Sequence, residues 1–326
     1  MPLTRTNPTP PFRITRTSHA VLGVTDLSRS RDFYVDKLGF ILSERTENAL
    51  YLRGLEERQH HSLVLVEAAE PTCMRLGFKV AGDQELDRAK DWFEARGQPT
   101  RWALAHAQGR TLHATGPHGL PLEFCADMTP VARQLQQYAR YHGAHIMRID
   151  HLNLFTHDVQ STHDFFAELG FRTTEYTDTS EKGDLWAVWM QRKGNVHDLA
   201  LTSGRGPRLH HIGLWVPTAM NIIHACDLLA TSGHAAALER GPGRHGISNA
   251  FFLYLRDPDG HRIELYTSDY LTVDYDFQPI RWALDDPQRQ TLWGQPAPRS
   301  WFEEGTPFAG AEVRQPLLGA QPVMAH

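Results

Sequence analysis

The chain repeats itself, and the repeat limits the folds that it can adopt. HAVLGVTDLSRSRDFYVDKLGF begins at His19, and HLNLFTHDVQSTHDFFAELGF begins at His151. Both contain a histidine, an apolar strand, an aspartate and a helical stretch that ends in Leu-Gly-Phe. GPHGLPLEF (116–124) and DPDGHRIEL (257–265) share Pro-x-Gly-x-x-x-Glu, which is typical of a turn followed by a strand. The repeat predicts two homologous halves, roughly 12–130 and 145–275.

Each half divides again into two modules. HLNLF at His151 and HIGLW at His211 share the pattern His, aliphatic, small or polar, Leu, aromatic, and a helical stretch follows each. We expect the helix over 220–233 to be closed by its final glycine, and its counterpart over 84–97 to be capped by Asp83. The pattern predicts an α+β fold of two tandem domains, each made of paired βαβββ modules, rather than an alternating parallel sheet.

The domains are expected at 1–140 and 141–285, followed by a C-terminal segment over 286–326. This segment is polar and rich in proline and glycine. Its aromatic residues Trp293, Trp301 and Phe302 predict a lid or a subunit contact. We expect its last fifteen or so residues to be flexible.

Composition excludes several classes of function. The 326 residues carry a formal net charge of −5 without a basic block, so nucleic acid is not an expected partner. The longest apolar runs have the length of strands, and the polar, proline-rich N-terminus does not resemble a signal peptide, so no membrane association is expected. The three cysteines, Cys73, Cys125 and Cys226, share no CxxC spacing, which is typical of reduced thiols and predicts a cytoplasmic location.

Adjacent histidines open the apolar run RLHHIGLWV. Neighbouring residues of a strand point to opposite faces, so at most one of them is expected in a shared site. The module alignment places His211 in register with His151, and predicts that His210 is a packed or hydrogen-bonded residue on the other face. Glu264 lies between two aliphatic residues, where a carboxylate needs a partner. Two histidines and one carboxylate form the triad that binds Fe(II) and leaves positions open for substrate and O₂.

The first half serves as a control for this assignment. His19 and Glu123 stand at the equivalent positions, but Arg75 replaces the second histidine. A fixed cation at a ligand position is incompatible with a metal ion there. We therefore predict one metal ion per chain, in the C-terminal catalytic domain, and a degenerate N-terminal domain without metal.

Long motifs resemble the type I extradiol catechol dioxygenases of the vicinal oxygen chelate superfamily, and the homoprotocatechuate 2,3-dioxygenases in particular. They include RIDHLNL, RKGNVHDLALT, GPRLHHIGLWV and ERGPGRHGISNAFFLYLRDPDGHRIELYTSDY, with VTDLSRSRDFYVDKLGF and HHSLVL in the first half. The resemblance implies the glyoxalase/bleomycin resistance-like fold and cleavage of a catechol ring with both atoms of O₂ incorporated. It also implies Fe(II), or Mn(II) in some relatives, held by His151, His211 and Glu264, and a homotetramer.

The resemblance also implies three catalytic residues. His197 lies in a stretch of period two and shares a face with apolar residues; read alone it is a hydrogen-bonded histidine, whereas the family places its acid/base histidine here. Tyr254 read alone is a core tyrosine whose hydroxyl needs a partner, and the family uses it to hydrogen-bond substrate and oxygenated intermediates. His245 lies in a Gly/Pro-rich loop that the family places near the substrate hydroxyl.

The substrate pocket is expected to include Asn153, Trp189, Arg240 and Arg289, again from the resemblance. Relatives that take a carboxylate-bearing substrate carry two consecutive arginines where this chain has Arg289 followed by Gln290. Glutamine cannot replace the bidentate charge of an arginine. The expected substrate is 3,4-dihydroxyphenylacetate, converted to 5-carboxymethyl-2-hydroxymuconate semialdehyde; the alternative is another substituted catechol with a shorter, neutral or differently placed substituent.

Two other classes use the same kind of fold. Glyoxalase-type enzymes commonly take four ligands from paired modules and bind Zn or Ni, whereas three ligands are counted here. A metal-free binding protein on a doubled scaffold has no need for an intact triad. The triad therefore favours a dioxygenase over both alternatives.

Overall fold

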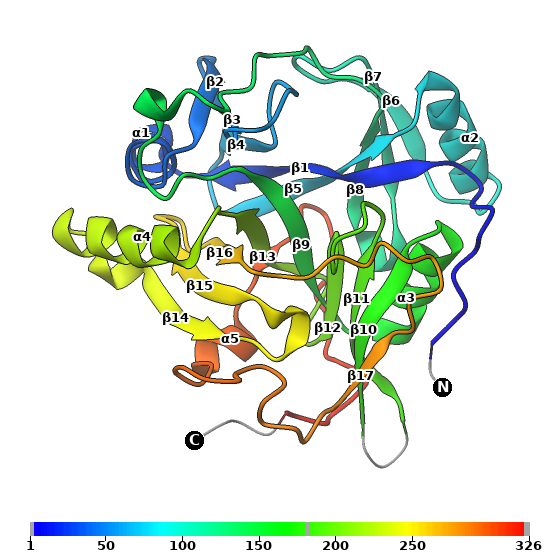
Figure 1. Ribbon diagram of the computed structural model, residues 1–326. Coiled ribbons are helices and arrows are strands. Elements are labelled where there is room, and N and C mark those ends of the chain that lie inside the picture. Colours follow the sequence, from blue (N-terminus) through cyan, green and yellow to red (C-terminus); the bar gives the residue numbers. More distant parts are fainter. Residues whose placement is uncertain (1–2, 180–182, 323–326) are drawn as a thin grey trace.

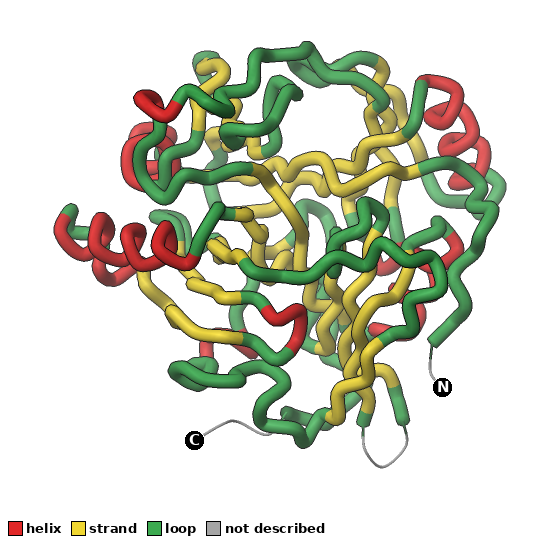
Figure 2. The backbone as a smooth tube through the Cα atoms, viewed as in Figure 1, coloured by secondary structure: helices red, strands yellow, loops and turns green. Residues whose placement is uncertain are grey.

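The strands of the computed structural model, which describes residues 3–179 and 183–322, form two large sheets, one in each half of the chain (Figure 1, Figure 2). The first sheet has eight strands in the order β2-β3-β4-β1-β5-β8-β7-β6. The second has ten, in the order β14-β15-β16-β13-β9-β12-β11-β10-β17, with β18 beside β13. The N-terminal sheet lies in the upper part of Figure 1 and the C-terminal sheet below it.

The strands of the N-terminal half are β1 (Ile14–Val24), β2 (Ile41–Arg45), β3 (Ala49–Arg53), β4 (Leu63–Glu67), β5 (Thr72–Val80), β6 (Thr100–Leu104), β7 (Arg110–Thr115) and β8 (Pro121–Cys125). Its helices are α1 (Leu27–Arg31), the π-helix η1 (Asp32–Lys37), α2 (Asp83–Glu94) and the short η2 (Pro117–Gly119) and η3 (Tyr138–Arg140).

The strands of the C-terminal half are β9 (Arg148–Thr156), β10 (Arg172–Asp178), β11 (Leu185–Gln191), β12 (Leu199–Ser203), β13 (Arg208–Trp215), β14 (Leu238–Arg244), β15 (Phe251–Arg256), β16 (Arg262–Thr267), β17 (Ile280–Ala283) and β18 (Thr306–Pro307). Its helices are α3 (Val159–Glu168), α4 (Ala219–Thr231), α5 (Arg299–Glu303) and the short η4 (Ala235–Ala237) and η5 (Ile247–Asn249).

The four predicted modules are confirmed. Each runs strand, helix and three strands, and begins at β1, β5, β9 or β13. In every module the first and last strands lie side by side and parallel: β1 with β4, β5 with β8, β9 with β12, and β13 with β16. A parallel pair needs a crossover connection, and the helix and the two intervening strands of each module supply it.

The repeated aspartates begin the first helix of each half. Asp26 accepts hydrogen bonds from two backbone N–H groups of α1, and Asp158 accepts one from Ser161 of α3. The predicted cap at Asp83 is wrong: Gly82 is the N-cap of α2, and Asp83 is the first helical residue without a capping bond. Its carboxylate still lies at the positive end of the helix.

The two halves share one hydrophobic core. Phe78 of β5 packs against Phe166 and Phe171 of the C-terminal half, with ring centroids about 6 Å apart. The Thr17 backbone N–H donates to Asp198 over 2.9 Å, and both groups are buried. The halves therefore pack as one body, and a change in one is felt across the contact.

The C-terminal segment folds back over the second half. β18 pairs with β13, and Trp301 of α5 is buried. The tail that we expected to be flexible is held in place as far as Ala320: Arg314 exchanges backbone hydrogen bonds with Gly206, and the Ala320 carbonyl oxygen accepts a hydrogen bond from the Trp186 indole. Residues 323–326 lie outside the described chain.

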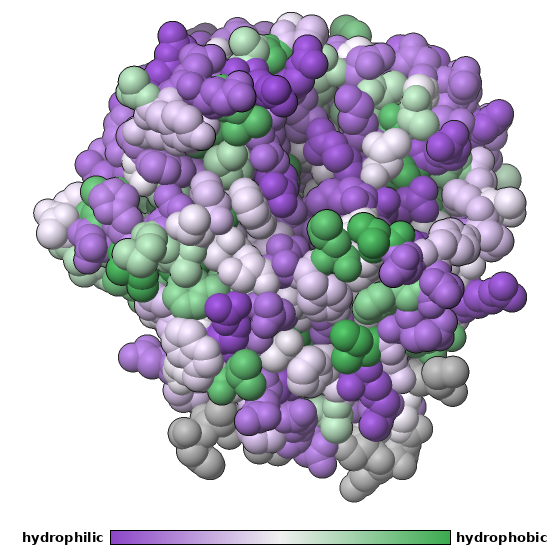
Figure 3. Space-filling view, viewed as in Figure 1, coloured by the Kyte–Doolittle hydropathy of each residue, from purple (hydrophilic) through white to green (hydrophobic). Residues whose placement is uncertain are grey.

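The surface carries no extended apolar region on the face shown in Figure 3, where apolar side chains form small separate groups among hydrophilic ones. Within the described residues, no helix is long and apolar enough to cross a membrane.

Candidate metal centre and active site

Three buried ligating side chains converge at the centre of the C-terminal sheet. His151 of β9, His211 of β13 and Glu264 of β16 come from three neighbouring strands. The Nε2 atoms of the two histidines are 3.2 Å apart, and Glu264 Oε2 is 2.9 Å from His151 Nε2 and 3.2 Å from His211 Nε2. The three side chains are at most 4 % exposed. The structure thus brings together the three residues predicted as ligands.

A glycine makes room for this cluster. Gly213 pairs with His151 on one side and with Glu264 on the other. A Cβ atom at Gly213 would lie 2.1 Å from the His151 ring, so any other residue here would displace the imidazole. Gly77 leaves the same space for His19 in the first half. Close approach to the ring accounts for a glycine in the middle of each strand.

The donor set fits a divalent cation. Burial alone would raise the pKa of Glu264, but its contacts with the imidazoles of His151, His211 and His245 hold it well below its usual range, so the carboxylate is charged. Two imidazole nitrogens and one carboxylate oxygen suit Fe(II) or Mn(II), and three protein ligands would leave coordination positions open for substrate and O₂. The separations of about 3 Å between donors are those expected from metal–ligand bonds of ~2.0–2.2 Å.

We expected His210 to lie on the face of the strand opposite His211, but the structure does not place it there. A β-bulge interrupts the pairing of β13 with β9 between Leu209 and His211, and the strict alternation of faces is lost there. His210 Nδ1 lies 2.6 Å from His211 Nδ1, and His210 Nε2 lies 2.9 Å from the Trp301 carbonyl oxygen. With His211 Nε2 facing the ligand cluster, its Nδ1–H donates to His210, which donates to Trp301. His210 therefore fixes the ring of a candidate ligand.

The equivalent position in the first half is filled by protein donors. Glu123 Oε1 contacts His19 Nε2 and Gln108 Nε2, each at 2.8 Å. Glu123 Oε2 lies 3.1 Å from Arg75 Nε and 2.8 Å from His113 Nε2. The cation predicted from the repeat is thus in direct contact with the carboxylate that corresponds to Glu264.

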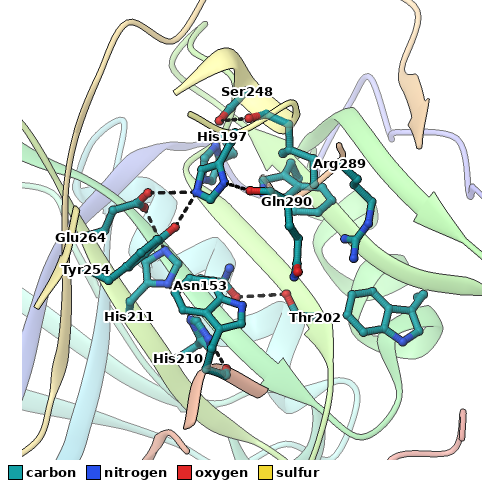
Figure 4. Close-up of a pocket in the computed structure, with 15 residues that line it drawn as sticks. Asn153, His197, Thr202, His210, His211, Ser248, Tyr254, Glu264, Arg289 and Gln290 are labelled. Carbon is teal, nitrogen blue, oxygen red and sulfur yellow. Dashed lines mark hydrogen bonds and ion pairs between the residues drawn. The ribbon is translucent and has the colours of Figure 1, made fainter. Parts of the chain in front are cut away.

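A pocket opens beside the C-terminal triad (Figure 4). Eight of its lining residues are predicted site residues: Asn153, Trp189, His197, His211, His245, Tyr254, Glu264 and Arg289. Arg289 lies with Gln290 on the wall away from Glu264 and His211 (Figure 4). The remaining lining residues were not predicted as pocket residues: Trp186, Thr202, His210, Ile247, Ser248 and Trp301.

Sequence signals existed for some of these missed residues. Ile247 and Ser248 lie in the Gly/Pro-rich loop from which His245 was taken, and Trp301 lies in the segment expected to form a lid. Thr202 donates a hydrogen bond to Asn153 across the parallel pair of β12 and β9. Nothing in the sequence pattern separates Trp186 from an ordinary core residue.

His197 lies directly against the triad. Its ring centroid is 4.0 Å from that of His151, and its side chain lines the pocket. Burial, reinforced by the neighbouring His151, holds the pKa of His197 well below its usual range, so it is neutral at pH 7. Its Nδ1 has no hydrogen-bond partner among the described residues. A neutral imidazole at this place can accept a proton from a bound ligand.

Tyr254 and His245 form a hydrogen-bonded pair beside the carboxylate. Tyr254 pairs with Glu264 across the strands, and its hydroxyl lies 2.9 Å from His245 Nε2. His245 Nδ1 contacts the carbonyl oxygen of Gln290, which can only accept, so Nε2 is free to accept from Tyr254. Burial raises the pKa of Tyr254 far above its usual range and keeps the hydroxyl protonated.

The far wall carries one guanidinium. Arg289 is 1 % exposed and packs on the Trp186 ring, and its Nε has no partner among the described residues. Burial lowers the pKa of Arg289 to about 10, which leaves it charged at pH 7. A buried cation with a free donor is suited to an anionic substituent.

Arg240 is placed differently from our expectation. It does not line the pocket; its Nη2 donates to Thr291 Oγ1 and to the Gln290 carbonyl oxygen, and its guanidinium packs over Trp301. The Gly/Pro-rich loop thus turns this side chain behind Tyr254. Arg240 supports the wall of the pocket rather than forming it.

Comparison with known proteins agrees with this geometry. The Glyoxalase/Bleomycin resistance protein/Dioxygenase superfamily matches residues 16–124 and 148–265, one match in each half. A metapyrocatechase of Geobacillus stearothermophilus is 29 % identical over 94 % of this chain and 98 % of its own. A manganese-dependent 2,3-dihydroxybiphenyl 1,2-dioxygenase of Geobacillus genomosp. 3 is 29 % identical over 87 % and 94 %.

Comparison with solved structures also finds extradiol dioxygenases. An extradiol ring-cleaving dioxygenase from B. fuscum superposes with a TM-score of 0.91 at 40 % identity, over 95 % of this chain and 88 % of that one. An anaerobic complex of homoprotocatechuate 2,3-dioxygenase from Brevibacterium fuscum with 3,4-dihydroxyphenylacetate also gives 0.91 and 40 %, over 95 % and 98 %. The chain belongs to the Glyoxalase/Bleomycin resistance protein/Dioxygenase superfamily. Within it, the chain is an extradiol ring-cleaving dioxygenase.

Proposed function

We propose that this dioxygenase cleaves 3,4-dihydroxyphenylacetate beside its hydroxyl groups, giving 5-carboxymethyl-2-hydroxymuconate semialdehyde with both atoms of O₂ incorporated. The observation that carries the proposal is the arrangement of one pocket. The triad residues His211 and Glu264 line it on one side and the buried Arg289 on the other (Figure 4). A catechol bound at the triad would direct its side chain towards this cation.

A divalent ion, Fe(II) or Mn(II), held by His151, His211 and Glu264 would lower the pKa of the catechol hydroxyls and bring the catechol and O₂ together. The protein residues accept, donate and hydrogen-bond the protons of the reaction. We propose that His197, neutral at pH 7 and beside His151, accepts a catechol proton and returns it later in the reaction. The Tyr254 hydroxyl donates to His245 Nε2, which fixes its orientation, and its oxygen is left to accept a hydrogen bond from a substrate hydroxyl.

The other pocket residues orient the ring. Asn153 comes from the same strand as His151 and is tied to Thr202, so its amide is held at the cavity wall. Trp189 provides an apolar wall that is 8 % exposed. Arg240 acts through the backbone of Gln290, which it holds by a hydrogen bond. These roles keep the ring in one pose and limit the access of water.

Gln290 decides how strongly a carboxylate is preferred. Its amide offers a hydrogen bond but no charge, so Arg289 alone supplies the cation of the lining. Oxygen uptake by the Fe(II)-loaded enzyme with 3,4-dihydroxyphenylacetate, 4-methylcatechol and protocatechuate tests the substrate. We expect the highest kcat/KM with the first. Preference for 4-methylcatechol would assign a neutral substituent instead, and uptake with none of the three would assign a catechol with a different substituent.

We further propose the division into a degenerate N-terminal domain (1–140), a catalytic domain (141–285) and a covering C-terminal segment (286–326). The pairing of β18 with β13 supports the covering role of this last segment. A homotetramer in the cytoplasm is proposed as well, in line with three cysteines that form no disulfide. Light scattering of the purified enzyme tests the assembly.

A further inference from the structure

A second cluster of ligating side chains lies in the N-terminal half, away from the catalytic pocket. It consists of Glu44 of β2, His60 before β4 and His106 after β6. Glu44 Oε2 is 2.9 Å from His106 Nε2 and 3.3 Å from His60 Nε2. One ligating atom from each residue lies within 4.8 Å of the other two. Within the described residues, only the catalytic triad forms another such group.

The two separations from Glu44 Oε2 to the histidines match those of the catalytic triad. There the three donor atoms are 2.9–3.2 Å apart. Metal–ligand bonds of ~2.0–2.1 Å at a tetrahedral or octahedral ion place neighbouring donors ~3.0–3.4 Å apart. In both clusters the separations between carboxylate and histidine are therefore those of a metal site, although the clusters use unrelated positions of the repeat.

The contacts of His60 fix the orientation of its ring, as is typical of a metal ligand. Its side chain is 8 % exposed, and its Nδ1 lies 3.1 Å from His61 Nδ1. When Nε2 faces an ion, Nδ1 carries the proton and donates it to His61, as His211 does to His210. Tyr51 packs against the rings of His60 and His106, with centroids 5.6 and 4.7 Å away. These contacts leave the imidazole few alternative orientations.

The turn that carries His106 is also fixed. The Thr129 N–H donates to the Ala107 carbonyl over 2.8 Å, and the Gly109 N–H donates to Asp127 over 3.1 Å. Strands β2 and β6 are the two edges of the eight-stranded sheet. An ion held by Glu44 and His106 would therefore connect opposite edges of one sheet.

We propose that Glu44, His60 and His106 bind one divalent ion of the zinc type as a peripheral structural site. Two imidazoles favour Zn²⁺ and its transition-metal neighbours over Mg²⁺ or Ca²⁺, which take oxygen ligands. The side chains of Glu44 and His106 are 42 % and 41 % exposed, so water completes the coordination and the ion exchanges with solvent. Hydrogen bonds from the two histidines to Glu44 account for the same distances without an ion, and the experiment separates the two cases.

The test uses Mn(II)-loaded holoenzyme equilibrated with Zn²⁺, separated from free ions, and analysed for both metals by mass spectrometry. The sum of Mn and Zn is the readout, because Zn²⁺ that displaces manganese at the triad leaves the sum unchanged. We expect about two ions per chain for the wild type and about one for His106→Ala and Glu44→Gln. His142→Ala, which removes an exposed histidine elsewhere in the same half, should keep the sum at two.

Thermal unfolding gives a second readout. Zn²⁺ should raise the unfolding temperature of the wild type and of His142→Ala, but not that of His106→Ala, because an ion that binds only the folded state stabilises it. Turnover should be the same in all three proteins. A sum of one ion in the wild type, or the same excess of zinc in His106→Ala, would overturn the proposal.

Discussion

The two halves of the chain place a carboxylate at the same point of the same module and use it differently. Glu264 faces His151 and His211 and has room for an ion, whereas Glu123 is surrounded by Arg75, His113, His19 and Gln108. In the C-terminal half Tyr254 pairs with the carboxylate across the sheet, and His113 does so in the N-terminal half. The duplication therefore separates what the scaffold requires from what the chemistry requires.

The shared parts belong to the scaffold. Both halves keep the glycine beside the first histidine, because a Cβ there would strike its ring. Both keep a buried carboxylate in the parallel strand pair. The residues that differ decide whether the carboxylate contacts a metal ion or a guanidinium. Substitutions at matched positions of the two halves test this contrast.

Loss of one ligand should have the largest effect. In His211→Ala we expect metal binding to fall to background and kcat/KM to drop by at least ~10³-fold, because only His151 and Glu264 remain to hold the ion. Arg75→Ala, the matched change in the other half, should keep full metal content and turnover. Metal analysis and oxygen uptake measure both, and a metal-loaded, active His211→Ala enzyme would contradict the assignment.

The acid/base residue should come next. His197→Asn should keep its metal but lose ~10²–10⁴-fold in kcat, since the proton acceptor beside the bound substrate is gone. His61 is the matched control: it lies before β4 as His197 lies before β12, and its ring is 5.5 Å from His19. His61→Asn should leave kcat unchanged. Equal losses in the two variants would point to a shared structural role.

These two sites also show which features of the structure can be predicted from the sequence. The strand-and-helix repeat and the alignment of His19 with His151 were enough to predict four modules and to bring three ligands together. The alignment relies on the regular alternation of strands, and it failed at His210, where a bulge turns the ring towards His211. Arg240 was misplaced because the Gly/Pro-rich loop gives no period from which a direction can be deduced.

A smaller effect is expected at the carboxylate of the N-terminal half. Burial raises the pKa of Glu123, but hydrogen bonds from His113 and His19 outweigh it and hold the value well below the usual range. Glu123→Gln should leave turnover intact and lower the free energy of unfolding by about 2–3 kcal/mol at pH 7, because Arg75 and two histidines lose their acceptor.

The pH dependence of this loss identifies its cause. A carboxyl whose pKa is lowered on folding stabilises the protein fully above its unfolded pKa near 4.5, and this contribution falls as the pH drops below that value. The difference between wild type and Glu123→Gln in urea unfolding should therefore be constant from pH 6 to 7 and shrink below pH 4.5. A difference independent of pH would assign the loss to packing alone.

The smallest effect is expected at His210, where the structure changed our interpretation. His210→Ala removes the acceptor for His211 Nδ1–H, and loss of such a partner weakens metal affinity by ~10-fold, the low end of the usual range. His210→Gln should recover most of it, because the amide oxygen can accept from His211 while the amide nitrogen donates to the Trp301 carbonyl. Competition with a chelator measures the affinities, and pH profiles of binding should coincide for wild type and His210→Gln. If alanine and glutamine weaken binding equally, the bulge serves packing and the ring of His211 is held by the strand alone.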